Sequence, residues 1–313
     1  MIRHNGFDSL QKLAQDVPFD VFPQTLYTRE TLLDGFRAND TDAKAQTYDR
    51  RVYRHYIETG KLVANAQELA LRALHDQSIS AALDRYLSRH DHKKIVGIMG
   101  GHALLRTDLM YRKIALLSKR LTELGYLMVS GGGSGAMEAT HLGAWTAHRS
   151  NTEVKEIFSI LSKAPSSESS GWLEAAFEVI ERFPQTEFES LSVPSWLYSH
   201  EPSNIFATSI AKYFDNNTRE QRLLAMPLGG MVFTPGSAGT FMEIFEEAAL
   251  NHYATYGSAC PMIFMNERFW CEKTPMYPFL KKMISQGHYK NLDLMITDNL
   301  TDVIERIEQR QKS

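Results

Sequence analysis

Short apolar runs alternate with amphipathic stretches along the second two thirds of the chain. Strands are expected at residues 95–99, 126–129, 156–161, 231–234, 261–265 and in a short run that begins at Leu292. Between these runs, apolar residues recur at helical spacing, for example in 108–124 and 240–250. Strands separated by helices predict a parallel sheet with helices on both faces, which binds ligands at the carboxyl ends of its strands.

The first 90 residues follow a different pattern, because residues 64–74 and 79–87 repeat apolar side chains at helical spacing. We therefore predict a helical N-terminal region, residues 1–90, followed by a Rossmann-like, doubly wound α/β domain, residues 91–313. Residues 162–192 interrupt this domain with Ser, Pro and Glu, and predict an insertion that includes a short helix at 172–180. Further helices are predicted at 204–214, 219–226, 278–285 and 300–311.

One N-terminal segment, residues 34–54, is polar and highly charged. Two interpretations are open. The favoured one is a helix with a solvated, charged face, and the other is a lid or dimer arm that lends an arginine to a pocket. The charged residues are Arg37, Asp40, Asp42, Lys44, Asp49, Arg50, Arg51 and Arg54.

Composition narrows the class of protein. The 313 residues are 43% hydrophobic, with a formal net charge of -3 and a pI near 6.4. There is no basic excess to neutralise a phosphodiester backbone, so nucleic acid is not an expected partner. The N-terminus lacks an apolar signal core and no apolar run approaches membrane-spanning length, so no membrane is expected either. Two cysteines, Cys260 and Cys271, form no disulfide framework, which favours a cytoplasmic location.

The turn after the strand at 231–234 has the pattern of an anion site. Pro-Gly-Ser-Ala-Gly follows the strand, and a predicted helix begins directly after it. The first amides of a helix have no intrahelical partner and lie at the positive end of its dipole, so the turn predicts bound phosphate. Glu243 follows about one turn into the helix, beside the expected phosphate. The residues expected to hold the phosphate are Gly236, Ser237, Ala238, Gly239 and Thr240.

A second glycine turn follows the strand at 126–129. It formally satisfies the dinucleotide fingerprint G-x-G-x-x-A, but it follows the second strand of the unit, and the next expected strand, 156–161, ends without an acidic residue for a ribose. We therefore expect no NAD, and interpret the glycines as backbone laid against a ligand; the alternative is close packing of the helix on the sheet. Ser134 is expected to cap the helix. The expected contact residues are Gly131, Gly132, Gly133, Ser134, Gly135 and Met137.

Other site chemistries fit the sequence less well. A third turn, Gly100-Gly101-His102, is expected at the same edge of the sheet as a possible part of the site. Neither main turn contains the lysine of a nucleoside-triphosphate loop, and no His, Asp or Cys cluster indicates a metal, so no cofactor is expected. A serine nucleophile at Ser237, with Glu272 and His288 in the order of a triad, is a minor alternative because the elbow motif lacks its first glycine.

The two glycine turns together resemble the motifs of the LOG (Lonely Guy) family, long described as lysine decarboxylases. Gly131-Gly-Gly-Ser-Gly-Ala-Met-Glu and Pro235-Gly-Ser-Ala-Gly-Thr-Phe-Met-Glu are similar to its G-G-G-x-G-x-M-E and P-G-G-x-G-T-x-x-E. The resemblance covers residues 93–300 and implies hydrolysis of a nucleoside 5′-monophosphate to free base and ribose 5-phosphate. It departs at Ser237, where the family has glycine.

The resemblance also implies the catalytic residues and partners. The motif glutamate falls on Glu243, and the family's arginine falls on Arg219, with Arg222 as the alternative. Family members are commonly dimers, which implies a homodimer or higher homo-oligomer here. The rival function is a non-catalytic nucleotide sensor or a carrier of a phosphorylated cofactor, like the molybdenum-cofactor carriers that resemble this family.

Overall fold

A parallel sheet, seven-stranded in the part of the chain that the structure describes, forms the centre of the molecule. The computed structural model describes residues 12, 14–36, 46–198, 203–257 and 259–312. In that part of the chain the strand order is β4-β3-β2-β1-β5-β6-β7, with every neighbouring pair parallel, which confirms the predicted doubly wound α/β class. The strands are β1 (Ile95–Met99), β2 (Leu127–Ser130), β3 (Ser190–Ser192), β4 (Ser209–Ile210), β5 (Gly230–Phe233), β6 (Pro261–Phe264) and β7 (Asp293–Ile296).

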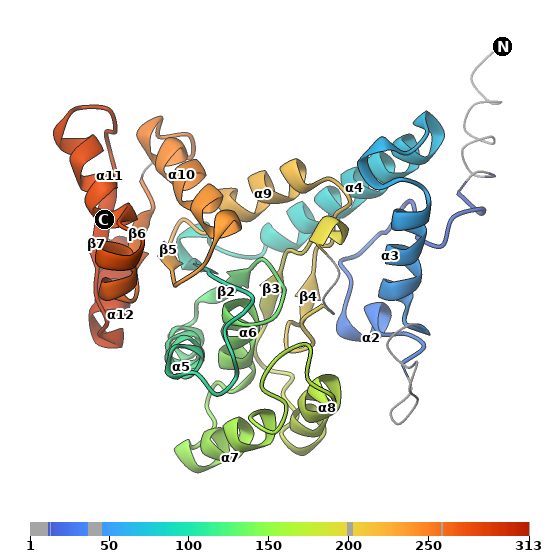
Figure 1. The fold of residues 1–313 in the computed structure, drawn as a ribbon, viewed down its shortest axis with the longest axis horizontal. Helices are drawn as coiled ribbons and strands as arrows, with labels where there is room; N and C mark the ends of the chain where they lie inside the picture. Colours follow the sequence, from blue (N-terminus) through green and yellow to red (C-terminus); the bar gives the residue numbers. More distant parts are fainter. Residues whose placement is uncertain (1–11, 13, 37–45, 199–202, 258, 313) are drawn as a thin grey trace.

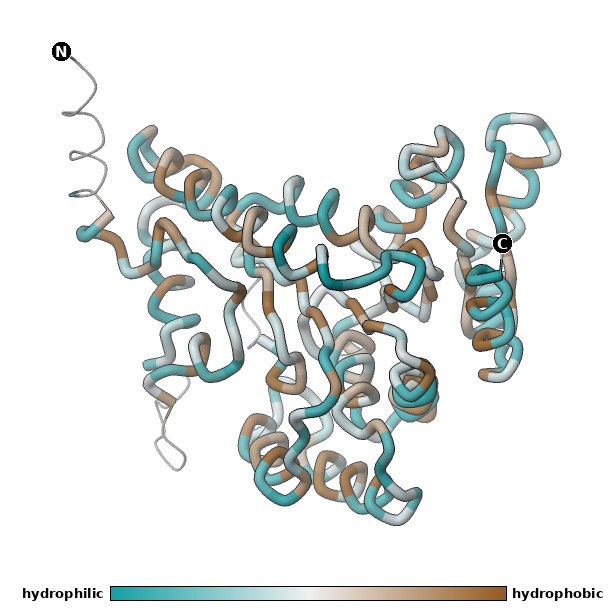
Figure 2. Tube along the Cα trace, turned by 180° about the vertical axis from the view of Figure 1, so that it is seen from behind, coloured by the Kyte–Doolittle hydropathy of each residue, from teal (hydrophilic) through white to brown (hydrophobic). Residues whose placement is uncertain are grey.

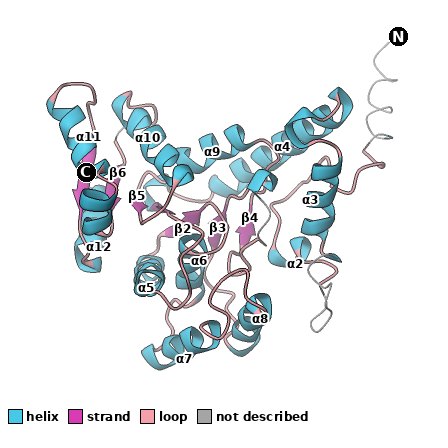
Figure 3. Cartoon of the chain, in the orientation of Figure 1, coloured by secondary structure: helices cyan, strands magenta, loops and turns pink. Residues whose placement is uncertain are grey.

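Helices cover both faces of the sheet (Figures 1 and 3). Alternate side chains of β1 point to the two faces: Ile95 and Met99 belong to one hydrophobic cluster of the core, whereas Val96 and Ile98 belong to the other. This period of two is expected of a strand buried on both sides. The helices are α2 (Arg29–Leu32), α3 (Tyr48–Glu58), α4 (Ala66–Leu87), α5 (Leu109–Glu123), α6 (Ala136–Trp145), α7 (Asn151–Leu161), α8 (Trp172–Arg182), α9 (Asn216–Ala225), α10 (Ala238–His252), α11 (Met276–Ser285) and α12 (Leu300–Lys312).

The predicted strand at 156–161 is wrong, because these residues end helix α7. Ser150 and Glu153 form a reciprocal capping box that starts this helix, and its apolar residues lie three or four positions apart on one buried face. The third strand is instead β3, inside the predicted insertion, and it ends in Ser192. The end of β3 therefore also lacks the acidic residue with which a dinucleotide-binding domain binds the ribose.

The predicted helix at 204–214 is also wrong, because this segment is extended and contains β4. Three consecutive residues, Ile205, Phe206 and Ala207, are all buried, which a helix with a single buried face does not allow. The predicted helices at 172–180 and 219–226 are confirmed as α8 and α9, with boundaries shifted by a few residues. Figure 2 shows the helices carrying brown and teal residues in alternation, as amphipathic helices do.

The N-terminal region packs into the same core as the sheet. Leu71, Ile79 and Leu83 of α4 are buried in one cluster with residues of β1, β3 and β5. Tyr27 exchanges two backbone hydrogen bonds, of 2.9 and 2.8 Å, with Ile210 of the edge strand β4. Packing is therefore continuous across residue 90, and the division into two domains there stays a prediction.

Two further features of the described residues bear on the class of protein. None of the helices found there combines the length and the apolar character needed to cross a bilayer. The same residues bring together no group of three or more His, Cys, Asp or Glu side chains with the geometry of a metal site.

Candidate functional site

Three glycine turns meet at the carboxyl ends of β1, β2 and β5. The Gly101 amide donates to the Pro235 carbonyl at 2.9 Å, and the Ala136 amide donates to the Gly101 carbonyl at 3.1 Å. The turn after β1 thus joins the other two, as expected where parallel strands end at one edge of a sheet. This arrangement forms the floor of a cavity of about 330 Å³, a size typical of small-molecule sites.

Most of the predicted site residues line this cavity. The structure brings together the turns after β1, β2 and β5 with residues of α9 and α10. The predicted residues in the cavity wall are Gly100, Gly101, His102, Gly131, Gly132, Gly133, Met137, Arg219, Ser237, Ala238, Gly239, Thr240 and Glu243.

Three of the predicted turn residues do not line the cavity. Ser134 and Gly135 border a neighbouring cavity of about 440 Å³, which shares His102 with the first. Ser134 does not cap α6, because its hydroxyl donates to the His102 carbonyl at 2.9 Å and the helix begins after Gly135. Gly236 packs closely against Thr240: a Cβ at residue 236 would lie 2.1 Å from the Thr240 hydroxyl.

The N-terminus of α10 opens into the cavity. Ser237, Ala238 and Gly239 are exposed, and a Cβ added at Gly239 would have no atom within 4 Å. Ser237 has φ -129°, ψ -148°, so its serine side chain needs no left-handed backbone. The amides of this first turn lack intrahelical acceptors and point where an anion would bind.

Arg219 is the arginine of the cavity. It is 7% exposed; its Nε donates to the Val193 carbonyl at 2.7 Å, its Nη2 to the Gly131 carbonyl at 3.3 Å, and its Nη1 to the Glu220 carboxylate. Arg222 points elsewhere, to the Ser80 carbonyl and to Asp84 on α4. The two candidate arginines are therefore separated by geometry, and only Arg219 borders the cavity.

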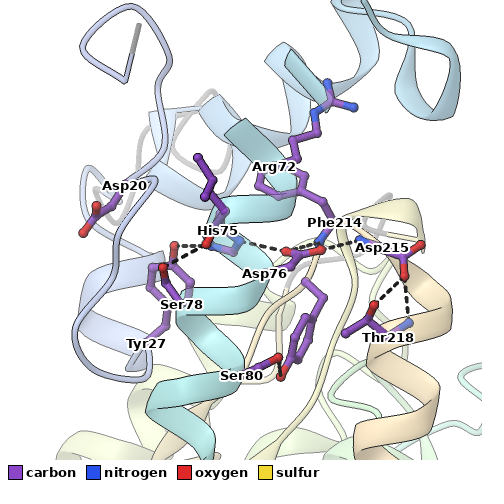
Figure 4. Close-up of polar contacts among 12 residues, drawn as sticks. Asp20, Tyr27, Arg72, His75, Asp76, Ser78, Ser80, Phe214, Asp215 and Thr218 are labelled. Atoms are coloured by element: carbon purple, nitrogen blue, oxygen red, sulfur yellow. Dashed lines mark hydrogen bonds and ion pairs between the residues drawn. The ribbon is translucent and has the colours of Figure 1, made fainter. Parts of the chain in front are cut away.

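The start of α9 is held by the N-terminal region (Figure 4). Asp76 on α4 accepts hydrogen bonds from the amides of Phe214 at 2.9 Å and Asp215 at 2.7 Å. Asp215 in turn caps α9 by accepting from the Thr218 amide at 2.8 Å. These hydrogen bonds hold the start of α9 in place, and the last of them is at the residue before Arg219.

Glu243 is a buried carboxyl in the cavity wall, 8% exposed. Burial, and next the negative charge of Glu220, raise its pKa to about 8, although the charge of Arg219 opposes the rise. A carboxyl with a pKa near neutrality in a cavity is a typical feature of a catalytic group. Glu247, one turn further along and 3% exposed, also has a pKa raised by burial to about 8, but it does not border the cavity.

The residues proposed for a serine triad do not assemble. Glu272 and His288 are both exposed, neither lines the cavity beside Ser237, and Glu272 pairs with Arg268. The structure gives the hydroxyl of Ser237 a place at the α10 N-terminus instead, where it adds a donor for an anion.

Sequence reasoning missed one end of the cavity. This end follows β3, which lies in the predicted insertion, and β4, which lies in a segment predicted as a helix, so no signal placed it at the sheet edge. The cavity residues there and on α9 are Pro194, Ser195, Tyr198, Ser203, Lys212 and Glu220.

The charged segment 34–54 supports that end with a carboxylate that does not itself line the cavity. Asp49 is 3% exposed and its Oδ1 lies 2.6 Å from the Lys212 ammonium, so the interpretation as a solvated helix face is wrong for this residue. Arg50 borders the neighbouring cavity rather than this one. Arg37, Asp40, Asp42 and Lys44 lie outside the described residues.

Comparison with known proteins identifies similar solved structures only. No model of a known protein family and no curated protein sequence matches the chain. The chain is similar to the X-ray structure of TM1055, a structural genomics target, with 18% identity, a TM-score of 0.44, and coverage of 69% of this chain and 98% of that one. It is also similar to a molybdenum cofactor carrier protein from Chlamydomonas reinhardtii, with 14% identity, a TM-score of 0.39, and coverage of 70% and 99%. At these values the likeness carries no argument about function, which rests on the site itself.

Proposed function

We propose that this protein hydrolyses the N-glycosidic bond of a nucleoside 5′-monophosphate, giving a free base and ribose 5-phosphate. One observation carries the proposal: Glu243 is buried in the wall of a cavity into which the N-terminus of its own helix opens. A phosphate bound at that N-terminus brings the attached ribose against the first turns of α10, and thus beside Glu243.

The phosphate end is formed by the exposed amides of Ser237, Ala238 and Gly239, with the hydroxyls of Ser237 and Thr240. Arg219 adds positive charge, although its guanidinium already bonds two backbone carbonyls and Glu220. Its bonds to the Gly131 and Val193 carbonyls join the start of α9 to the turn after β2 and to the segment after β3. We propose that Arg219 holds these segments in place and attracts the phosphate into the cavity.

Glu243 acts on the ribose. As the bond between C1′ and the base breaks, its electron pair leaves with the base, and positive charge spreads over C1′ and the ring oxygen. The Glu243 carboxylate stabilises that charge and accepts a proton from the water that attacks C1′. Glu243 then releases this proton to solvent water and the base anion takes one up from it, so the sum is nucleotide plus water to ribose 5-phosphate plus neutral base.

Base release from a panel of 5′-monophosphates is the direct test. Purified protein is incubated with AMP, GMP, IMP, CMP and UMP, and free base and ribose 5-phosphate are separated by chromatography. The proposal requires equal amounts of both products from at least one nucleotide. A protein that binds a nucleotide or copurifies with a phosphorylated pterin, but releases no base, is a sensor or carrier instead.

A further inference from the structure

The end of the cavity opposite the α10 turn carries a buried lysine. Lys212 is 1% exposed and lines the cavity together with Ser203. Its ammonium donates to Asp49 at 2.6 Å and to the Ser203 hydroxyl at 2.9 Å, and Ser203 donates to the other Asp49 oxygen at 3.1 Å. Trp196 also donates its indole N–H to Asp49 at 2.9 Å. The lysine is thus held in one place by three different elements of the fold.

The lysine retains the capacity to bind a ligand. An ammonium has three protons, and among the described residues Lys212 makes two hydrogen bonds, to Asp49 and Ser203. Burial lowers its pKa, whereas Asp49 opposes that change. An ammonium is a donor only, so this end of the cavity favours a ligand atom that accepts a hydrogen bond.

The sheet places this lysine where the base of the nucleotide would lie. The α10 turn follows β5, the other glycine turns follow β1 and β2, and Lys212 lies two residues after β4. From β5 to β4 the sheet runs β5-β1-β2-β3-β4, four strand spacings or about 19 Å. With the phosphate above β5 and the ribose above β1 and β2, the base extends toward β3 and β4.

We propose that Lys212, held in place by Asp49 and Ser203, recognises a carbonyl oxygen on the base, which makes the substrate an oxo-base nucleotide rather than an adenine nucleotide. This inference takes the orientation of the nucleotide from the proposed function. An ammonium beside the oxygen also stabilises the departing base, because the electron pair left on the ring nitrogen is delocalised onto the carbonyl oxygen. At the ring position of that carbonyl, adenine presents an amino group, a donor that opposes the ammonium.

The N-terminal region completes this end of the site. Asp49 lies in the first turn of α3, and it is the carboxylate that neutralises Lys212. Without it the ammonium would be buried with no opposite charge, at a cost large enough to displace or deprotonate it. The helical region outside the family resemblance thus acts as the support of the base-recognition end.

IMP and AMP provide a matched test, because they differ only in a carbonyl oxygen against an amino group at one ring position. Their affinities are measured by calorimetry with the Glu243→Gln protein, which prevents turnover, and their kcat/KM values are measured with the unmodified protein. We expect IMP to be favoured over AMP at least about tenfold in both measurements. Equal values, or a preference for AMP, would overturn the inference.

A double variant, Lys212→Met with Asp49→Asn, removes both charges together so that neither is left buried alone. We expect the preference for IMP over AMP to fall to about twofold or less, while Lys163→Met, at a solvated lysine on the surface, leaves it unchanged. A folded double variant that retains the full preference contradicts the assignment. If the double variant does not fold, the comparison of IMP with AMP in the unmodified protein decides alone.

The two proposals fail in different ways. Release of base with no preference for IMP overturns the recognition by Lys212 and leaves the hydrolase standing. Tighter binding of IMP without release of base overturns the hydrolase and leaves the recognition as a property of a binding site. Absence of binding by all five monophosphates of the panel overturns both.

Discussion

Glu138 and Glu243 occupy similar places in two similar motifs and have opposite surroundings. Each follows a glycine turn and a methionine, near the start of the helix that leaves the sheet. Glu138 is 1% exposed and accepts hydrogen bonds from Arg106 at 2.6 and 3.0 Å and from Tyr111 at 2.9 Å. Glu243 is buried in a cavity wall, and there its pKa is raised to about 8.

The comparison teaches that the motif fixes the position of a glutamate, whereas its neighbours decide its role. A carboxylate that accepts hydrogen bonds from an arginine and a tyrosine holds the protein together, and Glu138 does so although it borders the neighbouring cavity. A carboxyl with a raised pKa beside an open helix N-terminus can instead act in a reaction, because its carboxylate is stabilised by the positive charge that develops on the ribose.

The largest effect is expected from Glu243→Gln. The amide keeps the size of the side chain but provides neither a negative charge for the ribose nor a base for water, so turnover should fall roughly a thousandfold. Nucleotide affinity should be nearly unchanged, since the phosphate contacts remain. Base release and calorimetry measure the two quantities. A Gln variant that releases base at the normal rate would rule out the proposed mechanism.

Glu138→Gln should act on stability instead. Removing one charge leaves Arg106 buried without its partner, which should lower the free energy of unfolding by about 3 kcal/mol. Urea denaturation followed by circular dichroism measures the change, with turnover per folded molecule unaffected. Arg106→Met combined with Glu138→Leu serves as the control, because losing both charges should cost less than losing one. A fully stable Glu138→Gln protein would contradict the structural role.

The pH profile of activity sharpens the contrast between the two glutamates. With a pKa of about 8, Glu243 is mostly protonated at pH 6 and becomes a carboxylate as the pH rises. Because the carboxylate is the proposed active form, kcat/KM should rise about tenfold per pH unit from pH 6 to near pH 8 and then level off. The residual activity of Glu243→Gln should not show this rise. A rate that falls over the same range would indicate that the protonated form is needed.

The sequence predicted the sheet better than it predicted the cavity. Strands such as 95–99 and 231–234 are apolar runs ended by glycine turns, so both their positions and the turns after them were predictable. β3 contains only Ser190, Leu191 and Ser192, and it is a strand because it lies between two other strands. No periodic signal exists in so short a segment, since the backbone pairing that defines it is not local.

The missed end of the cavity has the same cause. Lys212 and Asp49 are 163 residues apart in sequence, and nothing in the local pattern of either residue indicates that they form a buried ion pair. The charge of Asp49, on a polar segment, instead favoured a solvated face. The choice between Arg219 and Arg222 likewise needed the orientation of α9, which spacing alone left open by one helical step.

Substituting two glycines of the α10 turn should have the smallest effects, and it separates changes in stability from changes in nucleotide affinity. Gly239 lies in the first turn of α10, and a Cβ there meets no protein atom within 4 Å. Gly239→Ala should therefore stabilise the protein by up to about 1 kcal/mol, through the better helix propensity of alanine. Its methyl group would nevertheless occupy the space proposed for the phosphate, so nucleotide affinity should fall about tenfold.

Gly236→Ala is the matched variant, and it should lower the stability of the protein rather than raise it. Its Cβ would lie 2.1 Å from the Thr240 hydroxyl, so the turn must shift, and stability should fall by about 1 to 3 kcal/mol. Thermal unfolding and calorimetry with a common monophosphate report both quantities for both variants. If Gly239→Ala binds the nucleotide as tightly as the unmodified protein does, the phosphate does not rest on this turn. Glu243 would then have no reason to face the ribose, and its contrast with Glu138 would reflect burial alone.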